Sequence, residues 1–550
     1  MISTTDIVIT IAYILFIVTI GLWSGTRKKK NEETTSGEYF LAGKTLKWPM
    51  IGLALFATNI SCLHLVSLAQ SGFDSGLLNG NFEWMAAFTL ILLALLFIPF
   101  YIRSGISTLP DFLERRYNRA CRDWLAFISI LSAIIIHIAF SFLAGGIVLE
   151  TLFGIDMYVS IVVIALLTGL YTIIGGLRAV VVTETIQSLV LITGAIIITY
   201  FAWNKVGGWD HMTAVLQKEN AMDKLSMIRP IGDKSGMSWI AVFLGYPILG
   251  IWYWCADQTI VQRVLGAKDE NHARVGSLFC GFIKILPVFI FVLPGLFAYI
   301  LYKSGTMDLS SLQTVGANGE TALNTKGIYT LMITQLLPKG LVGILVAALL
   351  SGLMSQIAGA LNSIATLSSY DLYKRFKPET SDKKLVSVGR WSAGIALAVS
   401  IGLLPLLNSY ESLFNGINDV IAHIAPPITC VFLLGVFWKK ASAKGAQYTL
   451  LLGSIIGAGV FVINKVYGAE TLIGKIPFMM MAFYLFCICV LIQVIFSYIY
   501  PVKHTAQSET LYWTSIWEPL KSKGWRGIGN YKFLSVLLLA IMGVLYVYFK

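Results

Sequence analysis

The chain has 550 residues, of which 56% are hydrophobic and only 13% are charged, and its mean hydropathy is +0.75. This composition excludes a soluble globular protein and predicts a membrane protein. The net charge of +12 does not indicate a nucleic-acid partner, because Lys and Arg are enriched in the cytoplasmic loops of membrane proteins.

Runs of about 20 apolar residues are long enough to cross a bilayer as helices, and the sequence contains fourteen of them. In chain order the predicted helices cover residues 5–24, 47–71, 78–102, 124–151, 157–175, 179–203, 238–262, 275–302, 338–370, 386–408, 411–438, 444–464, 476–500 and 530–549. The first run has no basic leader and no small-residue cleavage site, so we expect a retained helix and not a signal peptide. The predicted fold class is an all-α polytopic membrane protein.

The positions of Lys and Arg predict how these helices are oriented. Basic clusters follow odd-numbered helices, at residues 27–30, 103–122, 374–390 and 503–532. Because cytoplasmic loops hold the excess of positive charge, we expect these loops in the cytoplasm and the N-terminus outside. We expect the protein in the plasma (inner) membrane.

Three ionisable residues, His64, Glu83 and Lys284, lie inside the predicted helices. A charge at bilayer depth costs about 2.5 to 3.5 kcal/mol, so such residues usually mark a transport pathway or a functional site. Each also has a structural alternative: Glu83 at the membrane interface, Lys284 extended towards the membrane surface, and His64 bonded within the helix packing.

Two of the predicted helices carry interruptions. The second contains the polar stretch 57–62, and the seventh contains Gly245, Pro247 and Gly250, which weaken a helix. These helices are five apart, and because five is odd, two successive five-helix units enter the membrane in opposite directions. Such an inverted repeat with broken first helices places a transporter site at the bilayer midplane. The alternative is that Thr58 and Ser61 bond back to the preceding turn.

The repeat predicts how the chain is divided. Residues 1–45 form the first helix and a cytoplasmic basic loop, 46–205 the first repeat, and 206–237 an external loop. Residues 238–440 form the second repeat, and 441–550 form three peripheral C-terminal helices.

The polar residues of the interior favour a neutral, polyhydroxylated ligand. Glu83 accepts hydrogen bonds, Lys284 donates them, and His64 does either. Aromatic side chains nearby, Phe82, Tyr253 and Trp254, can stack on the apolar faces of a sugar ring. Small polar residues on the ninth helix serve either helix packing or a monovalent cation, and their spacing leaves both uses open: they are Ser355, Ser363 and Thr366.

The chain resembles the sodium/glucose cotransporter group of the sodium:solute symporter family through a series of motifs along most of its length. These motifs lie at residues 39–44, 57–61, 82–84, 175–187, 252–263, 362–373 and 437–440. The resemblance implies a leucine-transporter-type fold with a five-plus-five inverted repeat, one helix before it and three after it.

The resemblance also implies the functional residues. The implied substrate contacts are Asn59, His64, Glu83, Tyr253, Trp254, Lys284 and Asn418. The implied outer gate consists of Leu68, Phe82 and Phe414, and Tyr253 is the inner gate. The implied sodium ligands are Ala57, Ile60, Gly352, Ser355 and Gln356, and Glu184 lies on the ion pathway.

At four positions in or near this implied site, the sequence departs from the family pattern. Gly250 stands where the family has Thr or Asn, Asn418 where it has Gln, and Glu184 where it has Asp. Gln356 replaces the second of two adjacent serines. Its amide oxygen can bind a cation, or its NH₂ group can block one. Because a lost hydrogen-bond partner strongly shifts selectivity, the substrate class is a hexose, a pentose or a cyclitol, and not glucose specifically.

The predicted function is symport of a sugar or polyol with a cation, for which we favour sodium. The predicted partners are this small molecule and the lipid bilayer, and no obligatory protein partner is evident. The alternatives are another small solute, a sodium-independent or proton-coupled carrier, and a sugar sensor. An enzyme is not expected, because the six histidines show no metal-ligand spacing and no acidic cluster is present.

Overall fold

The computed structural model describes residues 3–26, 35–233, 235–315, 321–407, 413–468, 471–515 and 517–550. The basic cluster predicted at 27–30 therefore lies outside the described residues. Nearly all regular structure in the described part is helical; one short antiparallel hairpin, β1 (Gln313–Val315) and β2 (Thr321–Leu323), is its only sheet. The all-α class is as predicted.

Helices of the first half of the chain occupy much of the predicted membrane-spanning sequence. They are α1 (Thr4–Thr26), α2 (Ser36–Leu41), α3 (Trp48–Asn59), α4 (Cys62–Ser75), α5 (Asn81–Leu92), α6 (Ile98–Arg103), α7 (Leu109–Arg116), α8 (Arg119–Ser132), α9 (Phe140–Phe153), α10 (Met157–Val206) and α11 (Trp209–Lys218). A π-helical turn, Leu93–Phe97, joins α5 to α6, and another, Ala133–Ala139, joins α8 to α9.

The second half of the chain continues the same pattern. Its helices are α12 (Trp239–Ile251), α13 (Gln258–Leu265), α14 (Glu270–Ile283), α15 (Leu293–Lys303), α16 (Ile328–Leu336), α17 (Leu341–Leu367), α18 (Lys374–Phe376), α19 (Asp382–Gly402), α20 (Leu404–Leu407), α21 (Leu413–Phe437), α22 (Ala443–Tyr467), α23 (Phe478–Ile499) and α24 (Tyr531–Tyr548). A π-helical turn, Trp252–Ala256, extends α12.

Twelve helical stretches among the described residues are long and apolar enough to cross a bilayer, so the predicted count of fourteen is not confirmed. The difference arises where helices break or join. At 1.5 Å per residue, the 50-residue α10 would be about 75 Å long if straight, against a hydrocarbon core of about 30 Å. It bends at Gly176, whose φ of 62° and close approach to Tyr39 both require glycine.

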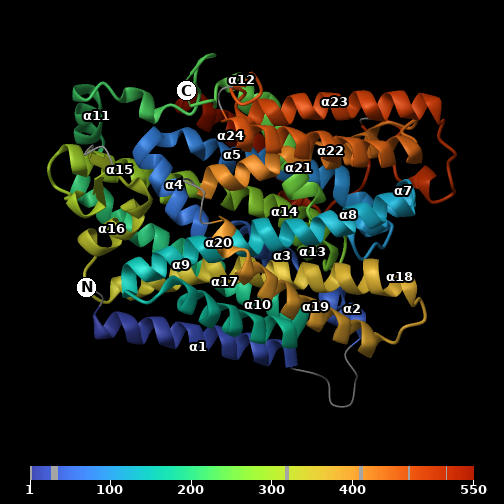
Figure 1. The fold of residues 1–550 in the computed structure, drawn as a ribbon, viewed down its shortest axis with the longest axis horizontal. Helices are drawn as coiled ribbons and strands as arrows, with labels where there is room; N and C mark the ends of the chain where they lie inside the picture. The colour runs from blue at the N-terminus through green and yellow to red at the C-terminus, as the bar shows by residue number, and fades with distance from the viewer. Residues whose placement is uncertain are drawn as a thin grey trace.

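Figure 1 shows the helices running side by side across the molecule, with α1 along one edge and α22 and α23 along the opposite edge. The centre is formed by α3, α10 and α17, which contact one another. Each helical stretch long enough to cross a bilayer has an apolar window of 18 residues. In the stretch that contains α17, 89% of this window is buried, whereas in α1 and in α24 only 22% is buried. The interior is therefore built around α17, and α1 and α24 are peripheral.

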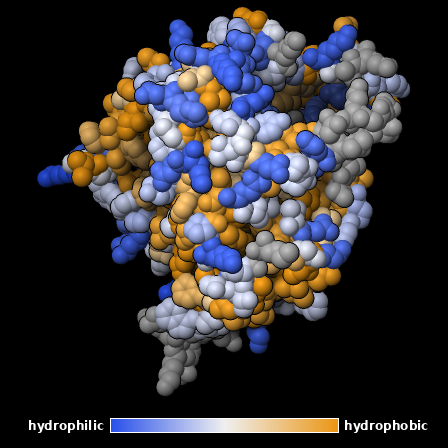
Figure 2. All heavy atoms as spheres, turned by 90° about the vertical axis from the view of Figure 1, so that its left-hand side faces the viewer, coloured by the Kyte–Doolittle hydropathy of each residue, from blue (hydrophilic) through white to orange (hydrophobic). Residues whose placement is uncertain are grey.

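Large apolar side chains are exposed on the outer helices. Examples are Leu15 on α1, Leu166 on α10, Leu491 on α23 and Val544 on α24, each more than half exposed. In Figure 2, which views the end of the molecule carrying α11 and α16, hydrophilic groups are scattered over the face towards the viewer, most densely at the top, and hydrophobic groups extend along the flanks. Apolar flanks of this extent are those of a multi-pass membrane protein, whose outer helices contact lipid.

Both interrupted helices are broken, although one break lies elsewhere than predicted. The first falls at Ile60 and Ser61, which are extended between α3 and α4. The second falls at Asp257, with φ of −84° and ψ of 121°, ten or more residues beyond Gly245 and Pro247.

The expectation that Gly245 to Gly250 unwind the seventh helix was wrong, because tertiary contacts stabilise the helix there. A Cβ at Gly245 would lie 2.3 Å from the Met479 carbonyl oxygen, so this glycine allows α23 to approach. The Thr429 hydroxyl donates to the Ile248 carbonyl at 2.8 Å, one residue after Pro247. Neighbouring side chains thus accommodate a proline inside a membrane helix.

Candidate functional site

A cavity of about 90 Å³ lies between the two broken helices and α5, α14 and α21. Its walls hold every residue predicted to contact substrate: Asn59, His64, Glu83, Tyr253, Trp254, Lys284 and Asn418. Gly250, Phe82 and Gln356 also face this cavity. The seven predicted contacts, which come from five separate segments of the sequence, therefore share one site.

Glu83 and Lys284 form a buried ion pair on the cavity wall. Glu83 lies in the first turn of α5 and Lys284 at the C-terminal end of α14, and the two residues are 2% and 1% exposed. The Lys284 ammonium donates to the Glu83 carboxylate and, at 2.6 Å, to Asn59 Oδ1. Asn59 Nδ2 in turn donates to the Tyr253 hydroxyl at 3.1 Å. Each charge is thereby compensated, and both broken helices are tied to the pair.

His64 is held at the start of α4. The Ser61 backbone N–H donates to His64 Nδ1 at 3.3 Å, so the neutral ring carries its hydrogen on Nε2. Because His64 faces the cavity, Nε2–H is a hydrogen-bond donor towards a ligand there. The ring is therefore positioned by the break itself.

The predicted outer gate is only partly in place at the cavity. Phe82 lines it and stacks on Phe478 with ring centroids 6.1 Å apart, whereas Leu68 is fully buried and is not among the lining residues. Phe414 belongs to the first turn of α21, and its side chain lies outside the described residues.

A second hollow of about 310 Å³ lies beside the first and was not predicted. It is lined by Leu63, Val66, Ser67 and Gln70 on one face of α4, and by Asn324 and Lys326. Leu63 lines both cavities, so its side chain stands between them. The i, i+3, i+4, i+7 spacing of these α4 residues was a visible signal of a common face.

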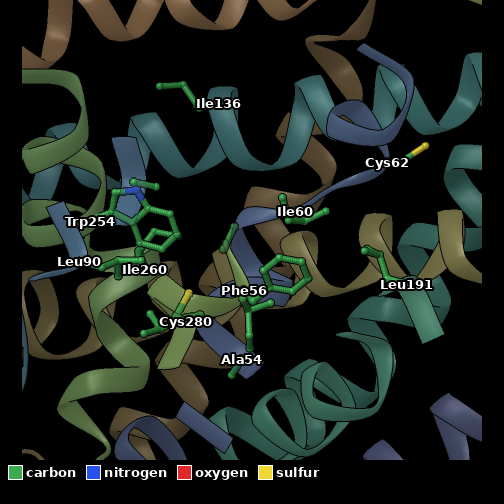
Figure 3. Close-up of a cluster of buried hydrophobic side chains, with 14 of the residues drawn as sticks. Ala54, Phe56, Ile60, Cys62, Leu90, Ile136, Leu191, Trp254, Ile260 and Cys280 are labelled. Carbon is green, nitrogen blue, oxygen red and sulfur yellow. The ribbon is translucent and has the colours of Figure 1, made fainter. Parts of the chain in front are cut away.

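The predicted ion site lies where α17 meets the break between α3 and α4. Ser355 Oγ donates to the Ala57 carbonyl at 2.8 Å, and it lies 3.1 Å from the Gly352 carbonyl. A Cβ at Gly352 would stand 3.0 Å from the Ser61 backbone carbon, so this glycine lets α17 approach the extended segment. Figure 3 shows Ile60 at the break. Carbonyl and hydroxyl oxygens of this kind suit a hard monovalent cation.

Gln356 is oriented differently from its neighbour Ser355. Its side chain lines the substrate cavity, and Gln356 Nε2 lies 3.3 Å from His137 Nδ1. His137 Nε2 is 2.7 Å from Asp257 Oδ2. His137 and Asp257 were not among the predicted site residues, although a His and an Asp within apolar runs are themselves such a signal.

Glu184 is fully buried, and its carboxylate accepts three hydrogen bonds from two residues. Arg263 Nη2 lies 2.5 Å from Glu184 Oε1, and Arg263 Nε lies 3.2 Å from Oε2. The Thr58 hydroxyl donates to Oε1 at 2.8 Å. The carboxylate thus ties α10 to both broken helices, and its role on an ion pathway stays a prediction.

The fold and the site together define a class of protein. An all-α membrane protein with two broken helices around a polar cavity is a solute transporter. A sequence profile of the Sodium:solute symporter family matches residues 39–457, and the chain belongs to this family. The family resemblance is confirmed, and the members of this family are transporters.

Several proteins of known name or structure are similar to this chain over most of its length. The Sodium/glucose cotransporter of Vibrio parahaemolyticus is 37% identical over 81% of this chain and 82% of its own length. The Sodium/glucose cotransporter 1 of Oryctolagus cuniculus is 32% identical over 90% of this chain and 79% of its own. A substrate-bound, outward-open Na⁺-coupled sialic acid symporter has the same fold, with a TM-score of 0.76 and 22% identity over 92% of this chain and 100% of that one.

Proposed function

We propose that this protein is a symporter that imports a sugar or sugar-like polyol together with sodium by alternating access. The observation that carries the proposal is the chain of hydrogen bonds from Glu83 through Lys284 and Asn59 to Tyr253 on the cavity wall. Two relatives named as sodium/glucose cotransporters support the same substrate class.

The chemistry of the wall favours a neutral polyhydroxylated ligand over a charged one. Glu83 already neutralises Lys284, so a carboxylate solute finds no unpaired cation there, and it would be repelled by Glu83. Hydroxyl groups both donate and accept, and they suit the adjacent carboxylate, amide and imidazole. Lys284 Nζ lies over the Trp254 ring, 5.7 Å from its centroid, and Trp254 also lines the cavity, where an aromatic ring suits an apolar sugar face. A hexose, a pentose or a cyclitol meets these requirements.

The oxygen atoms of Ala57, Gly352 and Ser355 at the break support sodium as the coupling ion. One positive charge that moves down 100 mV releases about 2.3 kcal/mol, which supports a roughly 50-fold accumulation of sugar. A cation that links α17 to the broken helix would stabilise one arrangement of the two against the other.

We also propose a membrane topology with fourteen crossings. It counts α3 and α4 as one broken crossing and α10 as two that meet at Gly176. Helices between α3 and α21 then form the two inverted repeats. The basic segments around α7 and α18 lie at the same end of the molecule (Figure 1), and we place this end in the cytoplasm of the plasma membrane with the N-terminus outside.

Uptake of labelled sugars into proteoliposomes tests the function. We expect accumulation with an inward sodium gradient, and little accumulation with potassium in its place. Lys284→Ala should abolish uptake, whereas Lys303→Ala, a matched change at a partly exposed ion pair with Glu219, should retain it. Equal uptake with and without sodium would remove sodium coupling, and it would favour a sodium-independent carrier.

A further inference from the structure

A row of three buried polar residues, Asp257, His137 and Gln356, lies beside the substrate cavity and is not used by the Glu83–Lys284 pair. The residues are 6%, 0% and 4% exposed. They come from the break after α12, the π-helical turn between α8 and α9, and the middle of α17. Only Gln356 lines the cavity, so the row begins behind the wall and ends on it.

The donors and acceptors of this row fix the orientation of the Gln356 amide. The Asp257 carboxylate accepts the Thr259 backbone N–H at 2.7 Å, and its other oxygen lies 2.7 Å from His137 Nε2. Because a carboxylate only accepts, Nε2 carries the ring hydrogen and Nδ1 of the neutral ring is an acceptor. It takes a hydrogen from Gln356 Nε2 at 3.3 Å, and Oε1 of Gln356 therefore points away from His137.

Gln356 Oε1 is buried and has no hydrogen-bond partner among the described residues. A buried amide oxygen without a partner is unfavourable, and a hydrogen-bond donor of a ligand would relieve this. Gln356 shares the lining of the cavity with Asn59 and Tyr253 of the hydrogen-bonded chain. Gln356 thus lies on the wall of the cavity that the substrate occupies in the proposed function, with Nε2 bonded to His137 and Oε1 left as the vacant acceptor.

We propose that Gln356 is a substrate-binding residue whose Oε1 accepts a hydrogen bond from one sugar hydroxyl, and that His137 and Asp257 are positioning residues that keep Oε1 turned towards the cavity. This inference rests on the proposed function and deepens it. It assigns Gln356 to the sugar and not to the ion. The hydroxyl of Ser355, the preceding residue, is bonded to the Ala57 and Gly352 carbonyls at the break, outside the cavity lining. The two side chains therefore serve different ligands.

A series of deoxy sugars identifies the hydroxyl, with KM and kcat of uptake measured in proteoliposomes. For the transported sugar, one deoxy analogue should bind about 10- to 100-fold more weakly to the native protein because Oε1 is left unpaired. Gln356→Met removes the acceptor, so this variant should bind the parent sugar and that analogue about equally. Gln493→Met, a matched change at a buried glutamine of α23, should keep the native preference.

Substitution of His137 provides a second, independent test, which distinguishes a positioning role from a purely structural one. His137→Phe removes the acceptor that holds Gln356 Nε2, and it should raise KM for the sugar carrying the selected hydroxyl with kcat little changed. His137→Asn keeps an acceptor oxygen and should restore part of the preference. Thermal unfolding of each variant in detergent checks that it is folded.

Two outcomes would overturn the inference while leaving the proposed function intact. One is that Gln356→Met weakens every deoxy analogue equally and shifts the sodium concentration for half-maximal uptake, which is the behaviour of an ion ligand. The other is that both His137 variants and Gln356→Met keep the native hydroxyl preference. If the native protein transports no sugar of the panel, the proposed function itself fails.

Discussion

Glu83 and Lys284 show how single residues determine this site. Each would be unfavourable alone in the membrane interior, and each compensates the other across the cavity wall. Loss of one partner leaves the other charge buried and unpaired, which is more unfavourable than loss of both.

We therefore expect Lys284→Met to lower the free energy of unfolding by about 3–5 kcal/mol. The double variant Lys284→Met with Glu83→Gln should recover much of this loss, because no unpaired charge remains. Thermal unfolding in detergent measures both. The exposed pair of Lys303 and Glu219 is the control, since removing it should change stability by less than about 1 kcal/mol. Strictly additive effects of the two substitutions would contradict the pairing.

The sequence predicted individual site residues better than it predicted how the helices pack. His64, Glu83 and Lys284 could be selected because polar residues are rare and unfavourable in apolar runs, and all three line one cavity. His137 and Asp257 carry the same signal but were not selected. Their relation to Gln356 depends on how three helices are rotated about their axes, and hydropathy does not contain that information.

At the scale of helices, close contacts between small residues set the position of the broken segments. Gly72 lies on α4 and Gly295 on α15. A Cβ on Gly72 would lie 2.0 Å from the carbonyl oxygen of Val292, the residue just before α15, and a Cβ on Gly295 would lie 1.9 Å from the carbonyl oxygen of Ala69 on α4. Such contacts are typical of membrane helices, whose backbones approach where side chains are small.

The Gly295→Ala variant should push α15 away from α4 and lower stability by about 1–3 kcal/mol. It should also reduce uptake, because α4 carries His64 and the wall of both cavities. Gly543→Ala on the peripheral α24, where an added Cβ meets nothing within 4 Å, is the matched control and should change neither property. Normal unfolding and uptake in Gly295→Ala would show that the α4–α15 contact is loose.

These contacts also explain why one helix break could be located from the sequence and the other could not. The break at Ile60 and Ser61 follows from a local polar stretch, so it was visible in the sequence. The break at Asp257 was placed too early, at Gly245 and Pro247, because glycine there serves the approach of α23. A glycine that permits packing and a glycine that unwinds a helix look alike until the neighbouring helix is known.

At the scale of the whole molecule, two hollows and the residue between them indicate a route for the substrate. Leu63 lines both the polar cavity and the hollow bounded by Asn324 and Lys326. In the proposed topology that hollow opens to the outside, at the end of the molecule that carries α11 and α16 (Figure 1). Alternating access requires this route to close when sugar and sodium are bound.

Labelling of Leu63→Cys with a membrane-impermeant maleimide tests this route in intact cells. Six of the seven native cysteines are buried, and Cys487 lies on the lipid-facing α23, so the background should be low. We expect labelling from outside in sodium alone, and several-fold slower labelling when the transported sugar is added, because the closed state withdraws Leu63 from solvent. Two exposed lysines provide the controls: Lys218→Cys on α11 should always be labelled, and Lys384→Cys on α19 only after the cells are permeabilised. Labelling of Lys384→Cys in intact cells would reverse the proposed orientation. If the labelling rate of Leu63→Cys does not change when sugar is added and transported, the substrate route lies elsewhere.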